Sequence, residues 1–324
     1  MCTAITFSAR DHYFGRNLDL EYSLNEHIII TPREYHFHFR NVGEINHHAA
    51  IIGIGTIVDN YPLYYDASNE DGLSIAALNF PDKAVYHSRK SGMFNITPFE
   101  FIPWLLCKCK TVNEAKEILK KTNITQENFS ENFPASPLHW IIADRDRSIT
   151  VESVMEGLKV YENPVGVLTN SPGFDYQMQN LENYLNLTSE EPVNRFSRKL
   201  KLKPYSLGMG AIGLPGDLSS ASRFVRAVFT KFNSRCEKDE NSAISQFFHI
   251  LASVAQPDGC TKTGKGYERT VYSSCCNTDK CIYYYTTYHN HQISAVSLRE
   301  EKLDQDKLVA YPIQRTQQIR WVNK

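Results

Sequence analysis

The sequence has no excess of either charge, no long apolar run and no basic cluster. Its 35 Lys and Arg residues are balanced by 36 Asp and Glu residues, so the formal net charge is −1. A protein without a basic field is not expected to bind nucleic acid or an anionic membrane surface. No stretch approaches the ~18 apolar residues that cross a bilayer, and polar residues follow the short apolar start at Phe7. We therefore expect a cytoplasmic protein without membrane insertion.

A dense set of metal ligands is also missing. The eight cysteines suit free thiols in a reducing compartment. Their closest group, Cys275, Cys276 and Cys281 in "SSCCNTDKC", has no second pair at zinc-site spacing. We expect no metal and no other cofactor.

A dinucleotide-binding motif is weak at best. Gly208, Gly210 and Gly213 have the right spacing, but no clean buried strand precedes them. Pro215 and Gly216 follow where a phosphate-binding helix would have to begin. The segment is predicted to be a glycine-rich loop.

The hydrophobic pattern alternates between blocks of strands and blocks of helices. Strands are expected at 3–8, 13–20, 49–58, 72–80, 268–275, 281–289 and 292–298, with three more within 137–161. Helices are expected at 97–109, 111–122, 174–185, 219–232 and 240–255, with Thr97 and Thr111 as caps of the first two. This order predicts two sheets between helix layers in one domain that spans 1–324.

The second residue, Cys2, raises the question of function, because a thiol at a chain end has no obvious structural use. If Met1 is removed, Cys2 carries both a nucleophile and an α-amine that can serve as its base. The next strand holds Arg16 and Asp19 in "GRNLD", a cation for a thiolate and a carboxylate for an ammonium. These two residues are three apart, so a regular strand points them to opposite faces. An ordinary ion pair at a strand edge is the alternative.

Five blocks of the sequence resemble one known family in their order along the chain. They are "MCTAIT…YFGRNLDLEYS", "EDGLSIAALNFP", "GVLTNSPGFDYQ", "GLPGDLSSASRFVRA" and "YSSCCNTDKCIYYYTTYHN". Together they resemble the choloylglycine hydrolases, which comprise bile salt hydrolases and penicillin V acylases. The resemblance implies an α+β fold, the αββα four-layer sandwich of N-terminal nucleophile hydrolases, and cleavage of an unactivated amide.

The resemblance also implies a role for each matching residue. Cys2 corresponds to the family's nucleophile, Arg16 to the arginine that supports its thiolate, and Asp19 to the carboxylate that orients its amine. Asn170 in "LTNSP" and the backbone of Asn79 in "LNFP" correspond to the donors for the oxyanion. A further implied electrostatic support is Arg223 in "SASRF".

The implied substrates are bile salts conjugated to glycine or taurine, because bile salt hydrolases tend to carry Asn at the position of Asn79. Penicillin V acylases tend to carry Tyr at that position, and a penicillin V acylase is the alternative function. A binding protein that kept the fold without catalysis is a second alternative. A sterol needs an apolar groove, and the candidate groove residues are Leu18, Tyr22, Leu24, Ile57, Tyr65, Phe129 and Leu138.

One long segment, 186–210, shows little periodicity although it carries several apolar residues. Unstructured loops beyond ~12–15 residues are uncommon in compact domains unless they are functional or disordered. We expect an assembly arm that reaches onto a neighbouring subunit, and a homotetramer, as in relatives of this family. The alternative is that the segment folds back onto its own subunit.

Overall fold

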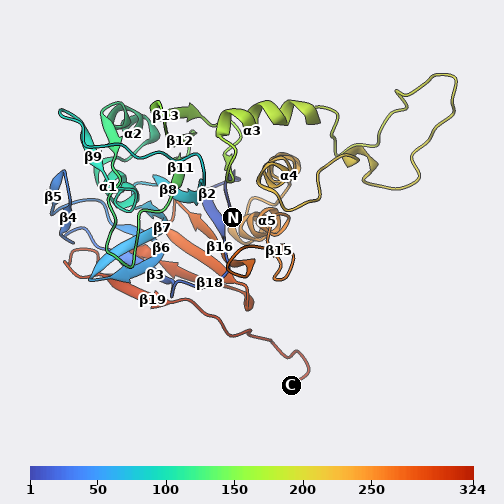
Figure 1. Cartoon of the computed structure of the whole chain (residues 1–324). Helices are drawn as coiled ribbons and strands as arrows, with labels where there is room; N and C mark the ends of the chain where they lie inside the picture. The colour runs from blue at the N-terminus through green and yellow to red at the C-terminus, as the bar shows by residue number, and fades with distance from the viewer.

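Two β-sheets lie face to face between two layers of helices in the computed structural model, which describes all 324 residues (Figure 1). The first sheet has the order β14-β1-β2-β16-β17-β18, with β15 paired to β16, and the second has the order β13-β12-β11-β8-β7-β6-β3-β19. The strands of the first sheet are β1 (Cys2–Ser8), β2 (His12–Leu20), β14 (Val167–Leu168), β15 (Thr261–Lys262), β16 (Tyr267–Asn277), β17 (Ile282–Thr287) and β18 (Asn290–Ser297). Those of the second are β3 (His27–Thr31), β6 (Ile51–Val58), β7 (Tyr61–Asn69), β8 (Ser74–Asn79), β11 (Leu138–Ala143), β12 (Ser148–Val154), β13 (Gly157–Glu162) and β19 (Val309–Pro312).

Each sheet has helices on its outer face. The helices are α1 (Phe101–Lys108), α2 (Val112–Leu119), α3 (Phe174–Leu181), α4 (Ser220–Asn233) and α5 (Glu240–Ala252), and the short 3-10 turns are η1 (Glu182–Tyr184), η2 (Met209–Ala211) and η3 (Leu298–Glu300). Helices α4 and α5 pack on β1, β2 and β16, whereas α1 packs on β7 and β8. Contacts of β1 and β2 with β8 join the two sheets. The layer order is therefore α-β-β-α, as the sequence predicts.

The strand β3 explains why some strands read as unbroken apolar runs. Ile28 and Ile30 belong to one buried cluster of 38 residues, while Ile29 belongs to a second cluster of 25 residues. A strand covered on both faces needs apolar side chains at successive positions. The same burial on both sides distinguishes a four-layer sandwich from a sheet with one wet face.

Four of the five predicted helix starts are confirmed to within one residue, and the first is shifted. The Thr111 side chain accepts a hydrogen bond from the backbone of Glu114, and Ser219 caps α4 in the same way. The backbone N–H and the hydroxyl of Thr97 both donate to the Glu100 carboxylate, but regular α-helix begins only at Phe101, so Thr97 is not its cap. The prediction of helix from residue 97 was wrong because residues 98–100 form a turn instead.

Several strands escaped the sequence pattern, β7 above all. Its sequence, "YPLYYDASN", contains Pro62 and the charged Asp66, both of which argue against a central strand. The remaining short strands, in two separate pairs, are β4 (Phe37–Phe39) with β5 (Gly43–Ile45) and β9 (Phe94–Ile96) with β10 (Thr122–Ile124). Helix α2 ends at Leu119 rather than at residue 122, because Thr122 is already the first residue of β10.

The hairpin β1–β2 and its neighbour β16 sit at the centre of the first sheet. Gly15 is required there, because a Cβ atom at this position would lie 2.0 Å from the Ser274 carbonyl oxygen. The pairing of β2 with β16 shifts between Thr270 and Tyr272, which is a β-bulge. The bulge lies opposite Leu18 and Asp19, so it shapes the sheet beside the chain's first residues.

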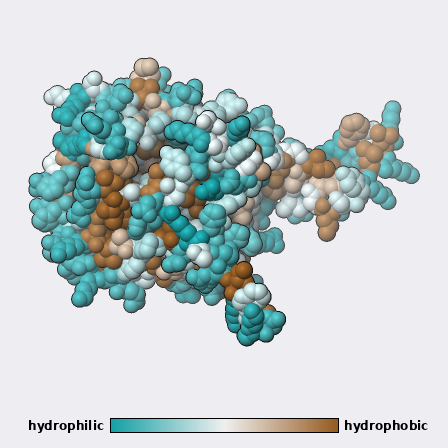
Figure 2. All heavy atoms as spheres, turned by 60° about the horizontal axis from the view of Figure 1, so that its bottom comes forward, coloured by the Kyte–Doolittle hydropathy of each residue, from teal (hydrophilic) through white to brown (hydrophobic).

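The segment 186–210 leaves the body after α3 and η1 and extends away from it before α4 (Figure 1). Phe196, Tyr205 and Leu207 are each more than four-fifths exposed, and Figure 2 shows apolar patches on this projection. The segment closes at its base, where the backbone N–H of Thr188 donates to Gly210. None of the helices is both long and apolar enough to cross a membrane.

Candidate active site

The thiol of Cys2 lies in the interior, at the start of the central strand β1. Cys2 is 3% exposed and pairs with Leu18, while Ala4 pairs with Arg16. Directly paired residues of antiparallel strands share a face, and so do residues two apart. Cys2, Arg16 and Leu18 therefore point to the same side of the first sheet.

Arg16 is a fully buried cation on the side of the thiol. Its Nη1 donates to the carbonyls of Tyr65, at 3.0 Å, and Ala77, both on the second sheet. Its Nη2 has no protein partner. Burial opposes its charge, but the acidic groups around it, Cys2 first, raise the pKa of Arg16, so it stays a cation. Such a group stabilises a thiolate beside it.

Behind Arg16 lies a carboxylate that the sequence analysis missed. Asp66 on β7 accepts hydrogen bonds from Tyr272 at 2.6 Å, from Ser274 at 3.1 Å and from Tyr283. Burial raises the pKa of Asp66, and Arg16 is the first influence that lowers it. The signal in the sequence was an acidic residue in an otherwise apolar and aromatic strand.

Asp19 faces the opposite side of β2, as its spacing from Arg16 requires. Its Oδ1 accepts a hydrogen bond from Thr270 at 2.7 Å, and its buried Oδ2 has no partner. Burial raises the pKa of Asp19, opposed by the charges of Arg223 and the chain's amino terminus. The two residues thus do not share a face; they lie on either side of the strand that pairs with Cys2.

Met1 occupies the space at the end of β1. Its amine donates to the Asp19 carbonyl oxygen at 2.9 Å and to Glu268 Oε1 at 2.5 Å. Its carbonyl accepts from the Asp19 N–H at 2.9 Å. Glu268, on β16, is a second acidic neighbour that the sequence analysis did not identify.

The predicted oxyanion residues meet at the backbone of Cys2. The Cys2 N–H donates to Asn170 Oδ1 at 2.7 Å, and Asn170 Nδ2 donates to the Asn79 carbonyl oxygen at 2.7 Å. Arg223, fully buried on α4, donates to the Cys2 carbonyl oxygen at 2.5 Å and to Asn170 Oδ1 at 2.8 Å. Asn170, Asn79 and Arg223 are therefore tied to Cys2 from three different elements.

The seven candidate groove residues differ in how near they lie to the Cys2 cluster. Leu18 is buried beside Cys2, and Leu138 pairs with Asn79. The Thr56 hydroxyl bonds both the Leu24 carbonyl oxygen and the Tyr65 hydroxyl, so this pair lies together.

No hydrogen bond joins the other three candidates to the Cys2 cluster. Ile57 lies in the β6–β7 hairpin, and the ring of Phe129 packs 5.7 Å from that of Tyr61 in the same hairpin. Tyr22 is half exposed. These positions describe a surface around the hairpin rather than one continuous wall.

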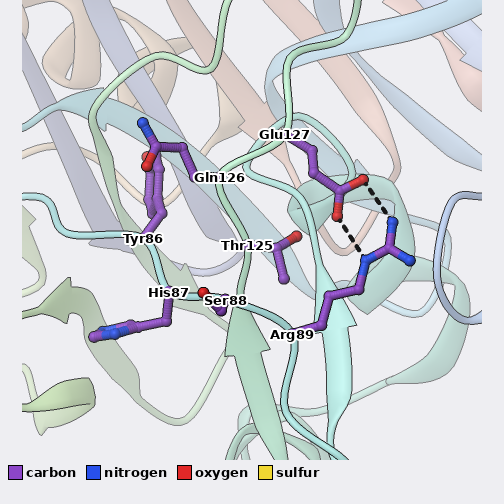
Figure 3. A pocket seen from close by; sticks show the side chains of 7 residues that line it. All are labelled: Tyr86, His87, Ser88, Arg89, Thr125, Gln126 and Glu127. Atoms are coloured by element: carbon purple, nitrogen blue, oxygen red, sulfur yellow. Dashed lines mark hydrogen bonds and ion pairs between the residues drawn. The ribbon is translucent and has the colours of Figure 1, made fainter.

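A separate surface hollow of about 460 Å³ opens between residues 86–89 and residues 125–127, which follow β10 (Figure 3). Its lining is almost entirely polar, and the Arg89 guanidinium pairs with Glu127 across it. None of the candidate catalytic or groove residues lines it. An apolar sterol would find little to contact there.

Two facing sheets clad by helices, with a cysteine at the start of a central strand, define an amide hydrolase of the N-terminal nucleophile type. Residues 2–311 match the model of a family described as linear amide C–N hydrolases, choloylglycine hydrolase family. The chain belongs to the choloylglycine hydrolase family.

Characterised relatives cover the whole chain. A bile salt hydrolase/transferase of Lactiplantibacillus plantarum is 56% identical over 324 residues, and one of Clostridium perfringens is 40% identical; each match covers all of both chains. The crystal structure of a mutant conjugated bile acid hydrolase from Clostridium perfringens superposes with a TM-score of 0.92 at 39% identity, again over all of both chains. A penicillin V acylase from Agrobacterium tumefaciens shares the fold, with a TM-score of 0.74 at 18% identity over 95% of this chain and 90% of its own.

Proposed function

We propose that this protein hydrolyses the amide bond of bile salts conjugated to glycine or taurine, with Cys2 as nucleophile after removal of Met1. The observation that carries the proposal is the buried cluster in which Asn170 joins the Cys2 backbone, Asn79 and Arg223. The relatives named for bile salt hydrolysis match over the full length of the chain and support the substrate class.

The first half of the reaction forms a thioester. The free α-amine of Cys2, oriented by Asp19, takes the thiol proton, and the thiolate, supported by Arg16, attacks the amide carbonyl carbon. Asn170 Nδ2 carries two hydrogens, of which one binds the Asn79 carbonyl oxygen, so the other remains for the oxyanion. The Asn79 backbone N–H is the proposed second donor. The ammonium then gives its proton to the leaving nitrogen, and the amino acid departs.

The second half returns the enzyme to its starting state. Water attacks the thioester carbonyl carbon while the Cys2 amine accepts one of its protons. The bond to sulfur breaks, the thiol is restored, and the free bile acid leaves. Every proton in this cycle is carried by Cys2, water or the substrate, so the proposed steps need no metal and no cofactor.

The apolar groove is proposed to lie between Cys2 and the β6–β7 hairpin. Leu18, Leu24, Tyr65 and Leu138 approach the catalytic cluster through the strand pairings and hydrogen bonds described above. Ile57 and Phe129 would add to this surface at the β6–β7 hairpin, and we assign the half-exposed Tyr22 to its edge. A rigid sterol would lie along the groove with its conjugated end at Cys2.

Release of glycine and taurine from a panel of conjugated bile salts tests this function, with penicillin V in parallel. We expect bile salt turnover by the wild type and its loss in Cys2→Ser, since a hydroxyl is a far weaker nucleophile than a thiolate at neutral pH. Penicillin V turnover that exceeds bile salt turnover would favour the acylase reading. Binding of conjugates without release of amino acid would favour the non-catalytic reading.

We also propose a cytoplasmic homotetramer held by the segment 186–210. All eight cysteines are free, in keeping with a reducing compartment. The apolar side chains on the projecting segment have no cover within the chain. A second copy of the chain would bury them.

A further inference from the structure

A buried imidazole and carboxylate stand directly behind the proposed oxyanion donors. His139 on β11 is fully buried, and its cross-strand partner on β12 is Glu152, 2% exposed. His139 Nδ1 lies 3.2 Å from Glu152 Oε1, and its Nε2 lies 2.9 Å from the Thr169 carbonyl oxygen. The proposed mechanism uses neither residue.

The hydrogen-bond roles of this pair are fixed by its partners. A backbone carbonyl oxygen only accepts, so Nε2 of His139 must donate to Thr169. A hydrogen bond on the other side of the ring then requires a proton between Nδ1 and the Glu152 carboxyl group. The ring is thereby held in one orientation, with its Nε2–H aimed at the residue before Asn170.

Glu152 fixes the far end of the same segment. Its Oε1 also accepts the backbone N–H of Phe174 at 3.0 Å, at the start of α3. Gly173 permits this approach, because a Cβ atom there would lie 3.2 Å from Glu152 Oε2. Asn170 lies in the loop between Thr169 and Phe174. His139 and Glu152 therefore hydrogen-bond this loop at both ends.

The other proposed donor is held by the face of the same ring. His139 stacks on Phe80 with ring centroids 4.2 Å apart and an interplanar angle of 6°. Phe80 directly follows Asn79, and its backbone N–H is anchored to the Pro137 carbonyl oxygen at 2.8 Å. One side chain thus contacts the residue after Asn79 and the residue before Asn170.

We propose that His139, oriented by Glu152, is a positioning residue that holds Asn79 and Asn170 at the spacing the oxyanion requires. The inference rests on the proposed function, because it assumes that these two asparagines donate to the oxyanion. His139 does not touch the substrate in this proposal. It acts on the transition state through the backbone on either side of it.

Three variants of His139 separate positioning from core filling. His139→Phe keeps the stack on Phe80 and the apolar volume but removes both hydrogen bonds. The amide nitrogen of Gln reaches the place of Nε2, whereas that of Asn reaches only the place of Nδ1. We expect kcat to fall about 10- to 100-fold in His139→Phe with little change in KM, because displacements near 1 Å can reduce rates ~100-fold. His139→Gln should restore most of kcat and His139→Asn should not.

If His139 only filled the core, the activities of the His139 variants would have the opposite order. His139→Phe, the best filler of a buried site, would then be at least as active as His139→Gln. The matched control is His12→Phe, a second buried histidine on the distant end of the β1–β2 hairpin, which should keep wild-type kcat. If His139→Phe fails to fold, the comparison of the Gln and Asn variants still decides.

Alkylation of Cys2 by iodoacetamide supplies a readout that needs no oxyanion. Its rate should be unchanged in His139→Phe while kcat falls; an equal fall in both would contradict the inference. Asn170→Ala serves as the reference, with an expected loss on the order of 100- to 1000-fold in kcat. Wild-type activity in Asn170→Ala would overturn the oxyanion role itself. A loss in Asn170→Ala with none in His139→Phe would overturn only the positioning role.

The double variant His139→Phe/Asn170→Ala completes the test. If His139 acts partly through Asn170, the double variant should lose clearly less than the product of the two single effects, since coupled residues are not additive. The loss that remains beyond Asn170→Ala then measures the share of His139 that acts through Asn79. A loss equal to the product of the two single effects would show that the residues act independently and would overturn the inference.

Discussion

Met1 and Asp19 pair backbone to backbone, one step beyond Cys2 on the β1–β2 ladder. The Asp19 N–H donates to the Met1 carbonyl oxygen, and the Met1 amine donates back to the Asp19 carbonyl oxygen, both at 2.9 Å. In this form the Cys2 nitrogen is a peptide amide that donates to Asn170 and has no basic lone pair. The proposed chemistry therefore requires that Met1 be removed.

Intact-mass measurement of active protein should show the loss of one methionine residue. A variant with lysine inserted between Met1 and Cys2 should keep Met1, because methionine removal needs a small second residue. We expect it to fold with wild-type circular dichroism and to lack amidase activity. Full activity in protein that still carries Met1 would contradict the use of the α-amine as base.

Iodoacetamide should inactivate the enzyme through Cys2 before it modifies the cysteines whose thiol pKa is raised by burial. Burial raises the pKa of Cys107 and Cys275 strongly and that of Cys109 to about 12, so these thiols react slowly at neutral pH. Cys260 is exposed and is the natural competitor.

The experiment is therefore best done in a Cys260→Ser background, with alkylation followed by peptide mass mapping. Modification at Cys2 should rise in step with loss of activity. Complete inactivation with Cys2 unmodified would rule out the assignment of the nucleophile.

The layer order was predicted from the sequence and is confirmed, and the structure brings the candidate catalytic residues together, but the groups that hold them were not predicted. Cys2, Arg16 and Asn170 lie in local motifs, so a resemblance can carry them over. Asp66 and His139 act through partners far along the chain, such as Tyr283 and Thr169, and no local pattern reveals that pairing.

The opposite facing of Arg16 and Asp19 followed from strand periodicity alone. What periodicity could not give was the contact of the amino terminus with Asp19 and Glu268. That depends on the pairing of β2 with both β1 and β16, which is a property of the whole sheet.

The electrostatic coupling between the buried Arg16 and the buried Asp66 should be measurable in the free energy of unfolding. Arg16→Met removes the cation that lowers the pKa of Asp66 and leaves a buried carboxylate without a compensating charge, which typically costs about 3–5 kcal/mol. The variant Arg16→Met/Asp66→Asn should recover part of this loss, because it no longer buries an unpaired carboxylate. Urea denaturation measures both, with the exposed Arg10→Met as control.

The same coupling predicts how the stability deficit of Arg16→Met changes with pH. Burial raises the pKa of Asp66 in the folded state, and the loss of Arg16 raises it further. A carboxyl group with a raised folded pKa destabilises the fold as pH rises above its unfolded value of about 3.9. The deficit of Arg16→Met should therefore be smaller at pH 5 than at pH 7.5. A deficit that grows toward acid would contradict this account.

The titration of Lys231 should make the free energy of unfolding rise with pH in mild alkali. Its ammonium on α4 donates to the Val165 carbonyl oxygen at 2.6 Å and to Thr6 at 2.9 Å, without a carboxylate partner, and burial lowers its pKa to about 8. The unfolded chain holds this proton up to about pH 10.4, so unfolding takes up a proton between these values. The free energy of unfolding should rise by about 2 kcal/mol from pH 8 to 10, relative to Lys231→Met.

The control for this comparison is Lys238→Met, which replaces an exposed lysine of the loop after α4. It should follow the wild-type pH profile. Equal profiles for wild type and Lys231→Met would show that Lys231 titrates as an ordinary lysine.

The projecting segment should determine the assembly state. Its apolar side chains include Phe196, Tyr205 and Leu207, and burial of each is worth roughly 2 kcal/mol or more. Replacement of residues 192–205 by a short Gly/Ser loop should therefore reduce the particle mass measured by light scattering. The matched control is Phe232→Ser, which removes an exposed aromatic side chain from α4 and should leave the mass unchanged. A loop variant of wild-type size would show that the segment does not mediate assembly, and a wild-type mass near 37.1 kDa would contradict the oligomer altogether.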